Sequence, residues 1–418
     1  MGHLYDGLKP SYRRVIWTGL EHPDKLVKVA TLAGVCGGKY SPHSPDSLPA
    51  VISELVRSGY FIGQGSHGSP SIYKPLTIDP AAPRYIEAKL HPEFRKMIQP
   101  LIPFVPYKES EVDSMYKEPL YIPIPIPIAM CFNSLGIGVG IRMKTPNFSM
   151  KSMLDAYFKD DPTLLRSNTD LEIDSNTSEL NSIWNKGYGR VTYKFFVDNK
   201  FKLEGQEGVL LYGNSSYIQL SKLSSKLKSP KEDPEDDEKG WMDKGLVEMI
   251  DLSSKRAGNK IFFRLKKGQR GKDKVTLKML SDEITSIGVH SDNYNLAITD
   301  GDQTKVRPLK EWIKFSYTNF ESLVKKYKTD KLSKLKLKSE VLKYSYDIAK
   351  AILADPKASK GSLSKTLGIK EEVVSEALKR SISSLLKGNV DSDIKSVKAE
   401  IKYVKSLKTK NFYEDFIK

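Results

Sequence analysis

An arginine and a tyrosine stand side by side at positions 84 and 85, and this pair could do the most specific chemistry in the chain. A phenol is a weak nucleophile at neutral pH, since its ordinary pKa is about 10. It becomes useful where a cation stabilises the developing phenolate and a charged phosphoryl transition state, and Arg84 is such a cation. An isolated pair of this kind is more often a strand or turn tyrosine beside a solvent-facing arginine. The surrounding motifs therefore decide between the two interpretations.

Composition limits the class of protein. The 418 residues are enough for two or three domains, and 67 basic against 51 acidic residues leave a formal charge of +16. Such an excess favours a polyanionic partner. Cys36 and Cys131 are too few and too far apart for a disulfide framework or a zinc site. With no signal peptide, and with an apolar run at 121–132 that is proline-rich and too short to span a bilayer, we expect a cytoplasmic protein with no membrane association.

The first 60 residues read as helices in a basic chain. Apolar spacing predicts a helix over 11–20, a second over 24–35 that ends at Gly37-Gly38, and a third, capped by Asp46 or Ser47, that runs to about Arg57. A helix, a glycine turn and a second helix outline a winged helix-turn-helix. Glycine-broken helix pairs occur in many folds, so this outline alone does not identify the class.

Two glycine-rich segments lie between these helices and the tyrosine. They are GKYSPH at 38–43 and GQGSHGS at 63–69. Glycines let a backbone approach phosphates closely, and Lys39 and His43 can contact or protonate phosphate oxygens. Taken singly, each segment is only a loop, and a lone histidine is usually structural or solvated. In order along the chain, however, the motifs are DGLKPxxRR, GKYxPH, GQGxxGS and AAxRYxE.

This order resembles the breakage-reunion subunit of type IIA DNA topoisomerases, the family of the gyrase and topoisomerase IV A subunits. The resemblance covers the first 150 residues by motif and the remainder as architecture. It implies that Tyr85 attacks a DNA phosphodiester and that Arg84 stabilises the phosphoryl centre. The other residues it places at the DNA are Lys9, Arg13 and Arg14 along the backbone, Lys39 and His43 at the cleavage site, and Gln64 in the loop beside that site.

The family also has an isoleucine that wedges between base pairs and bends the duplex. The glycine-rich segment 133–140 matches its surroundings and gives that role to Ile137. Without the resemblance, Ile137 would be interpreted as a core strand residue.

Three departures from the family pattern stand out. Ser41 replaces a usual histidine, and His67 replaces a usual phenylalanine, which questions the packing of its loop. The family also has an N-terminal arm before DGLKP that brings an arginine to the active site. We expect either a truncated chain or a second polypeptide that supplies this arm. Split topoisomerase genes of large tailed phages favour the second option, so the chain most resembles a phage-type medium subunit that works in a bacterial host.

The middle of the chain resembles the family's tower domain. Residues 121–142 read as strand-rich with X-Pro steps that force extended backbone. A strand is expected at 187–193, and segments 209–218 and 260–265 are expected to continue a mixed sheet. The acidic run 231–238 is interpreted as a solvated surface loop rather than a metal site, because nothing fixes its carboxylates.

Helical spacing dominates after Leu309. A lysine-rich helix is expected to about Leu353, roughly 70 Å long, and to stop at Asp355-Pro356. Short helices follow, with apolar faces at Leu378, Ile382, Leu385 and Leu386. Asp391 is expected to cap a return helix whose seam is Ile394, Val397, Ile401 and Val404. The resemblance makes this a coiled-coil arm with a helical dimer gate at about 357–390; the alternative is a basic helical hairpin of unknown use.

The expected fold is therefore α+β and multidomain. It comprises a winged-helix DNA-cleavage domain at 1–118, a mixed α/β tower at 119–308 and the coiled-coil arm with its gate at 309–418. The expected function is transient double-strand DNA breakage through a 5′-phosphotyrosyl bond, in a homodimer completed by ATPase/Toprim subunits.

The nucleotide-binding and metal-binding motifs of the family are not found in the sequence, so we expect ATP and Mg²⁺ on the partner and no metal on this chain. Two alternatives stay open. One is an architectural DNA-binding protein that kept the fold and lost the chemistry. The other is a plain helix-turn-helix regulator, which the arm and tower disfavour.

Overall fold

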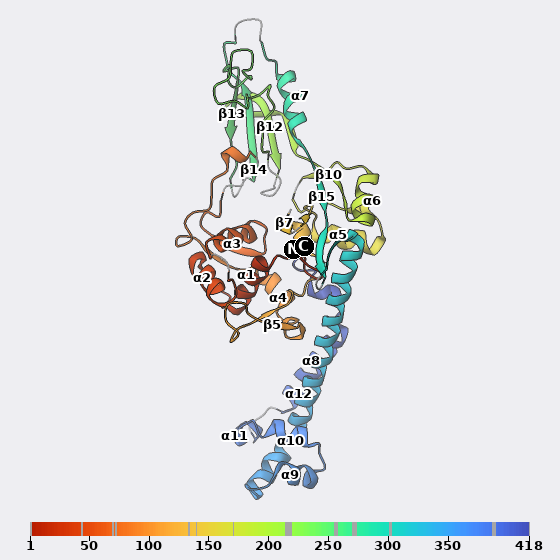
Figure 1. Ribbon diagram of the computed structural model, residues 1–418. Helices are drawn as coiled ribbons and strands as arrows, with labels where there is room; N and C mark the ends of the chain where they lie inside the picture. The colour runs from red at the N-terminus through yellow and green to blue at the C-terminus, as the bar shows by residue number, and fades with distance from the viewer. Residues whose placement is uncertain are drawn as a thin grey trace. The chain divides into compact units, whose positions relative to one another are not determined.

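Figure 1 shows the computed structural model of the chain. It describes residues 2–42, 45–68, 71, 73–132, 134–138, 140–169, 171–213, 220–254, 258–269, 274–300, 303–386 and 390–417. The chain divides into two compact units, one formed by 1–320 with 416–418 and one by 321–415. Both helices and antiparallel sheets are present, so the expected α+β class is confirmed. No helix within the described ranges is long and apolar enough to cross a membrane.

The N-terminal part alternates helices with a small sheet. In chain order its elements are α1 (Pro10–Glu21), β2 (Val27–Lys28), α2 (Val29–Lys39), α3 (Leu48–Arg57), β3 (Phe61–Gln64), β4 (Glu87–Leu90) and α4 (Pro92–Ile98). The three strands form an antiparallel sheet in the order β2-β4-β3. All three expected helices are present; α2 and α3 bury mainly apolar side chains, whereas α1 also buries two arginines.

The boundaries of the second and third helices differ from the prediction. Gly37-Gly38 does not end α2, which continues to Lys39 and is closed by a hydrogen bond from the Tyr40 N–H to the Cys36 carbonyl. Its start is later than expected, because residues 27–28 pair with β4 as a strand. Ser47 makes no capping hydrogen bond with its side chain; a 3₁₀ turn over Pro45–Ser47 leads directly into α3.

The proline-spaced segment is buried but is not a strand. Every residue from Tyr121 to Phe132 is buried, and the only regular structure in that stretch is a 3₁₀ turn at Ile128–Cys131. The second half of the strand-rich stretch expected at 121–142 does contain strands, but prolines lack the N–H that a sheet ladder needs, so its proline-rich half is extended, packed coil. It is flanked by two hairpins, β5 (Tyr107–Glu109) with β6 (Lys117–Pro119) and β7 (Leu135–Gly138) with β8 (Ile141–Lys144).

Two larger sheets follow. A five-stranded sheet has the order β7-β8-β15-β10-β9, and a four-stranded sheet has the order β11-β12-β14-β13, with α7 packed against β12 (Figure 1). The strand expected at 187–193 is present as β10. The expected mixed sheet around 209–218 and 260–265 is wrong, because β12 and β14 pair antiparallel; residues 214–219 lie outside the described part.

The remaining elements of the first unit complete these layers. The five-stranded sheet adds β9 (Glu172–Ile173), β10 (Tyr188–Lys194) and β15 (Val289–Asn295), and the four-stranded sheet comprises β11 (Phe196–Leu203), β12 (Gln206–Gly213), β13 (Val247–Asp251) and β14 (Asn259–Leu265). A third sheet pairs β1 (Gly2–His3), β16 (Ala297–Asp300) and β17 (Gln303–Val306). The helices are α5 (Met150–Lys159), α6 (Thr177–Lys186) and α7 (Leu277–Ile287).

The long helix expected after Leu309 is confirmed as α8 (Leu309–Ala354). The return helix α12 (Val390–Ser406) packs against it in the second unit. Its first described residue is Val390 and the segment just before it lies outside the described part, so the cap expected at Asp391 stays a prediction. The expected seam is the one that makes the contact, since an apolar cluster joins the two helices through Leu332, Leu335, Leu342, Ile394, Val397, Ile401 and Val404.

Short helices lie between α8 and α12, as expected. Those in the described part are α9 (Lys360–Leu367), α10 (Glu371–Ala377) and α11 (Ile382–Leu386). Their inner faces form a core with Val341, Ile348 and Ala349 of α8. Of the four apolar residues expected on their faces, only Leu385 is buried, whereas Leu378, Ile382 and Leu386 are exposed.

We expect Ile348→Ala to destabilise the second unit by about 2–5 kcal/mol, because it opens a cavity in this core. Leu353→Ala lies on the same helix at a side chain that is 58% exposed and should change stability by no more than about 0.5 kcal/mol. Denaturant unfolding of the full chain compares the two. Equal losses would contradict the assignment of Ile348 to a core.

Candidate active site

Tyr85 lies on a surface turn whose backbone is held by hydrogen bonds from the start of α2. Its side chain is 66% exposed, and its N–H donates to the Ala82 carbonyl at 2.9 Å. The first backbone N–H groups of α2, which a helix cannot satisfy internally, donate to carbonyls of this turn: Val29 to Ile86 at 3.0 Å and Ala30 to Pro83 at 3.1 Å. The turn therefore holds a fixed backbone while its phenol projects into solvent.

The Arg84 side chain folds onto this tyrosine. The carbon at the centre of its guanidinium lies 4.7 Å from the centroid of the Tyr85 ring, a cation–π arrangement. Both side chains are exposed. A positive charge therefore sits beside the phenol, where it can stabilise negative charge on the oxygen or on an approaching phosphate.

Gln64 is brought close to the tyrosine turn by the sheet. It pairs with Glu87 in the β3–β4 register and is exposed. Glu87 is two residues beyond Tyr85, so an amide side chain borders the turn. The resemblance implies that Gln64 lies in a loop beside the cleavage site; Gln64 is instead the last residue of β3, and the strand register keeps it next to the tyrosine turn.

His67 is a buried packing residue. Its Nδ1 lies 3.2 Å from the Ser53 hydroxyl on α3, and its Nε2 lies 3.0 Å from the Glu87 carbonyl on β4. A Cβ at Gly63 would lie 2.5 Å from that Nε2, so the glycine makes room for the imidazole. The packing that the sequence left in question is thus resolved: the histidine joins α3 to the sheet that carries the tyrosine turn.

A fully buried carboxylate organises the DGLKP motif, and sequence reasoning missed it. Asp6 accepts hydrogen bonds from Arg13 Nε at 2.8 Å and Nη2 at 3.0 Å, and from the backbone N–H groups of Leu8 and Ile122 at 2.9 Å each. The Arg13 guanidinium also donates to the Leu8 carbonyl. A seven-residue spacing between the aspartate and Arg13 was the available signal. The structure places Arg13 inside the protein and pairs it there.

Arg14 is also buried, but one side of it reaches a cleft. Its Nε and Nη2 donate to the two carboxylate oxygens of Glu118 at 2.9 and 3.0 Å, and Nη2 also lies 3.0 Å from Glu111. The cleft, of about 570 Å³, is lined by Lys9, Pro10, Ser11, Arg14, Ser41, Ser47, Glu111, Leu135, Gly136 and Ile137. The structure thus gathers three predicted DNA-contacting residues, Lys9, Arg14 and Ile137, around one hollow.

The charge and exposure of the lining residues differ. Burial lowers the pKa of Lys9, with Glu54 opposing that shift, and its ammonium lies 5.7 Å from the Tyr12 ring centroid. Ile137 is 80% exposed at the end of the β7–β8 hairpin, so the core interpretation of this residue is wrong. Ser41, the departure from the family histidine, is buried and its N–H donates to the Cys36 carbonyl.

Other predicted residues lie apart from the described lining of this cleft. Tyr85, Arg84 and Gln64 are not among its lining residues. Lys39, at the last turn of α2, lies 3.5 Å from Glu21 and 5.2 Å from the Tyr116 ring centroid. His43 lies outside the described residues.

The cysteines offer no reactive thiol. Burial raises the pKa of Cys36 to about 11 and that of Cys131 to about 12, so both stay protonated at neutral pH. Within the described ranges no three His, Cys, Asp or Glu side chains come together to hold a metal ion.

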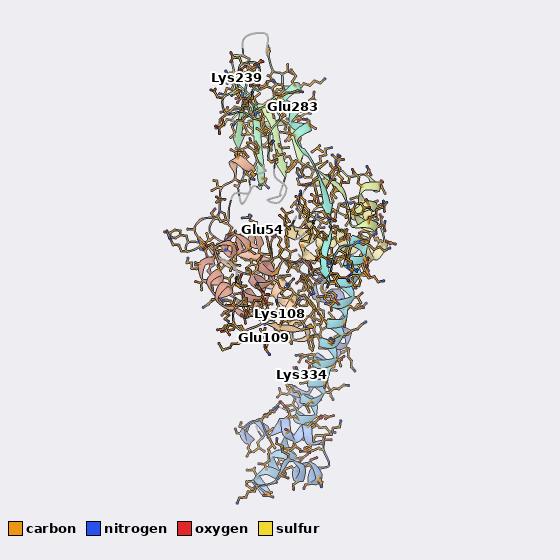
Figure 2. The ribbon with its side chains drawn as sticks, viewed as in Figure 1. Glu54, Lys108, Glu109, Lys239, Glu283 and Lys334 are labelled. Carbon is orange, nitrogen blue, oxygen red and sulfur yellow. The ribbon has the colours of Figure 1, made fainter. Side chains whose placement is uncertain are left out.

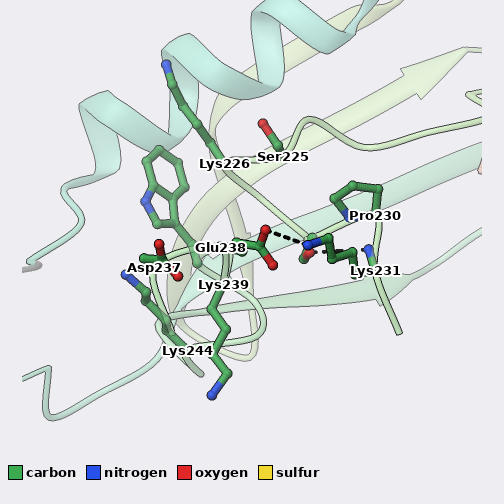
Figure 3. Close-up of a pocket in the computed structure, with 10 residues that line it drawn as sticks. Ser225, Lys226, Pro230, Lys231, Asp237, Glu238, Lys239 and Lys244 are labelled. Atoms are coloured by element: carbon green, nitrogen blue, oxygen red, sulfur yellow. Dashed lines mark hydrogen bonds and ion pairs between the residues drawn. The ribbon is translucent and has the colours of Figure 1, made fainter. Parts of the chain in front are cut away.

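The acidic run 231–238 forms ion pairs with neighbouring lysines. Lys231 lies 2.5 Å from Glu238 and Lys239 lies 2.5 Å from Asp236. Lys231, Glu238 and Lys239 line a hollow of about 460 Å³ beside Trp241, and Figure 3 shows the pair of Lys231 and Glu238 there. Because the carboxylates are exposed and matched by neighbouring lysines, the loop has the solvated, charged character that the sequence predicted.

The comparison with known families decides the relationship. The family model for the A subunits of DNA gyrase/topoisomerase IV matches residues 1–418. The chain belongs to this family. The DNA gyrase A subunit of Brachyspira hyodysenteriae is 24% identical over 375 residues, which are 81% of this chain and 41% of that protein. The chain thus spans less than half the length of this relative.

Two further relatives match shorter regions. The DNA gyrase A subunit of Thermotoga maritima is 27% identical over 210 residues, 44% of this chain and 25% of that protein. DNA topoisomerase 2 of Crithidia fasciculata is 32% identical over 133 residues, 29% of this chain and 10% of that protein. The family resemblance stated from the motifs is therefore confirmed at the level of the A-subunit family.

We expect Asp6→Asn to destabilise the first unit by about 3–5 kcal/mol, because it leaves the buried Arg13 charge without its counter-ion. Asp24→Asn is the matched control, since it breaks an exposed ion pair with Lys89 and should cost no more than about 1 kcal/mol. Thermal and denaturant unfolding give both values. A similar small effect for the two variants would show that Asp6 does not organise the motif.

Proposed function

We propose that this chain is the DNA breakage-reunion subunit of a type II topoisomerase, with Tyr85 as the covalent nucleophile. One observation carries the proposal: in a chain that matches the A-subunit family throughout, the tyrosine of AAPRYIE projects from a backbone-anchored turn with a guanidinium on its ring. Exposure lets a duplex reach the phenol, and the fixed turn supplies the positioning on which phosphoryl transfer depends.

The proposed reaction is a reversible transesterification. The Tyr85 oxygen forms a bond to a backbone phosphorus as the bond from phosphorus to the 3′ oxygen breaks. The phenol loses its proton, the 3′ oxygen gains one, and a 5′-phosphotyrosyl link remains. Arg84 would stabilise charge on the phosphoryl oxygens. Because the phosphodiester is exchanged for another phosphoester, the reverse reaction reseals the strand without a further cofactor.

The proposed DNA surface includes the cleft and the glycine-rich hairpin beside it. The order α1, β2, α2, α3, β3 and β4 is that of a winged helix and supports assigning this part to DNA binding. Lys9 and the cleft side of Arg14 would contact phosphates, with Lys39 and His43 near the cleavage site. We revise the role of Arg13: its bonds to Asp6 favour positioning of the motif over direct phosphate contact.

The proposed assembly follows the family resemblance. Mg²⁺ would be held by a partner Toprim domain, where a divalent ion stabilises the leaving oxygen, and ATP by a partner ATPase. The exposed apolar side chains of α11 and its approach, Leu378, Ile382 and Leu386, support a homodimer through the short-helix region as the proposed gate of a coiled-coil arm. A phage-type subunit in a bacterial cytoplasm fits this assembly.

The inactive architectural alternative has lost part of its motivation. His67, one of the departures behind it, is accommodated by hydrogen bonds and by Gly63 rather than disrupting its loop. Covalent trapping separates the two functions directly.

We expect Tyr85→Phe to abolish covalent adducts with DNA and to leave the fold and DNA affinity almost unchanged, because it removes only the attacking oxygen. Adducts are trapped with denaturant from reactions that contain Mg²⁺ and a cognate ATPase/Toprim subunit, and reactions without that subunit should give none. Tyr188→Phe, at another exposed tyrosine, is the control and should retain adducts. Adducts formed by Tyr85→Phe would refute the assignment.

We expect Ile137→Ala to reduce the bend of bound DNA and the rate of cleavage without lowering the melting temperature, because the side chain is 80% exposed. Fluorescence transfer between labelled duplex ends reports the bend. Met143→Ala, at a buried position on the neighbouring strand, is the control for loss of stability and should lower the melting temperature in the same assays. An unchanged bend angle in the Ile137 variant would contradict the proposed insertion of Ile137 between base pairs.

A further inference from the structure

Two carboxylates hold Arg14, and they differ in exposure. The Glu118 side chain is 4% exposed and binds the guanidinium with both oxygens. The Glu111 side chain is 52% exposed and meets Arg14 by a single contact of 3.0 Å, from the side where both residues line the cleft. One carboxylate therefore anchors the arginine from the interior, and the other covers it at the surface.

Glu111 also has a second cation to bind. Lys108 Nζ lies 2.9 Å from the same carboxylate and is itself partly exposed. The contacts with Lys108 and Arg14 lower the pKa of Glu111, so it is charged throughout the neutral range. If Glu111 leaves Arg14, its charge remains paired with Lys108 and hydrated. Arg14 stays in place after that departure, because Glu118 still holds two of its nitrogen atoms.

We propose that Glu111 is a displaceable counter-ion, which occupies the cleft side of Arg14 until a DNA phosphate takes its place. This inference rests on the proposed DNA-binding function. A phosphate that enters beside Lys9 meets a guanidinium already oriented by Glu118, so only the exposed carboxylate has to move. Glu111 then lowers the affinity of the free chain for polyanions in general and favours those that reach deep enough into the cleft to displace it.

The β5–β6 hairpin provides a matched pair of substitutions. Glu111→Gln removes the charge that touches Arg14. Glu109→Gln removes the same charge two residues away, at an exposed position opposite Lys117 in the hairpin register; Lys108 and Glu109 are labelled in Figure 2. Both variants raise the net charge equally, so a difference between them reports the contact and not the overall field.

Fluorescence anisotropy of the full chain with a short duplex measures the effect over a series of salt concentrations. Glu111→Gln should raise DNA affinity about three- to fivefold above Glu109→Gln, as expected for loss of one exposed ion pair. The slope of its salt dependence should stay close to that of the wild type, because the same phosphate contacts Arg14 in both proteins once Glu111 is displaced. Equal gains from the two variants would overturn the proposal and leave only a general charge effect.

A third variant separates the effect of the charge at position 111 from the effect of side-chain length. It also provides a test if the glutamine variant folds poorly. Glu111→Asp keeps the charge but shortens the side chain, so it should also gain affinity if contact with Arg14 matters. Wild-type affinity in a folded Asp variant, judged by its melting temperature, would overturn the inference. If the wild-type chain does not bind the duplex, the proposed function fails as well; binding with no difference among variants removes the counter-ion role alone.

Discussion

The buried pair of Asp6 and Arg13 is the constraint on which the N-terminal architecture depends. A carboxylate with no exposed surface is tolerated only when charge and hydrogen bonds replace the water it has lost. Asp6 obtains them from the side chain of α1, from its own turn and from the Ile122 N–H at the start of the buried proline run. These three segments must therefore come together at once. The Trp312 indole adds a fourth, since it donates to the Leu4 carbonyl at 2.6 Å.

The reactive residues are held by elements of this same framework. The orientation of α1 sets where Lys9 and Arg14 meet the cleft, and the N-terminus of α2 holds the turn that carries Tyr85. The site thus depends mainly on backbone hydrogen bonds and buried ion pairs beneath the surface. Of the groups proposed to touch DNA, Tyr85 and Ile137 are exposed, whereas Arg14 is buried and reaches the cleft on one side only.

The elements predicted correctly from the sequence are those with a strong apolar periodicity or a distinctive motif. The long helix α8 and the seam of α12 were found because apolar residues recur regularly in a polar background. The predicted end of α2 was wrong because a Gly-Gly pair, here Gly37-Gly38, is a common signal for the end of a helix. Glycines inside a helix are nevertheless tolerated where tertiary contacts support it. The strand prediction for the proline run was wrong, because the prolines indicate extended backbone but not the pairing of a strand. The residues of this run pack as buried coil.

The candidate site was harder to predict in its charged residues. Sequence position suggested that Arg13 and Arg14 face DNA, but a distant residue such as Glu118 cannot be paired with an arginine from spacing alone. The exposed residues Tyr85 and Ile137 were located by motif, which requires no knowledge of such long-range pairs. The division into three domains at 118 and 308 stays a prediction beside the two compact units.

The fit between Gly63 and His67 has an evolutionary consequence. Because a Cβ at position 63 would meet both the imidazole and a Val56 methyl group at 2.6 Å, the glycine cannot be replaced while the histidine stays. A larger residue at 63 therefore needs room from two side chains, those of His67 and Val56, so a single substitution cannot provide it. The dependence has one direction: His67 requires Gly63, whereas the family pattern joins the same glycine to a phenylalanine, so the histidine could arise only in a lineage that already had the glycine.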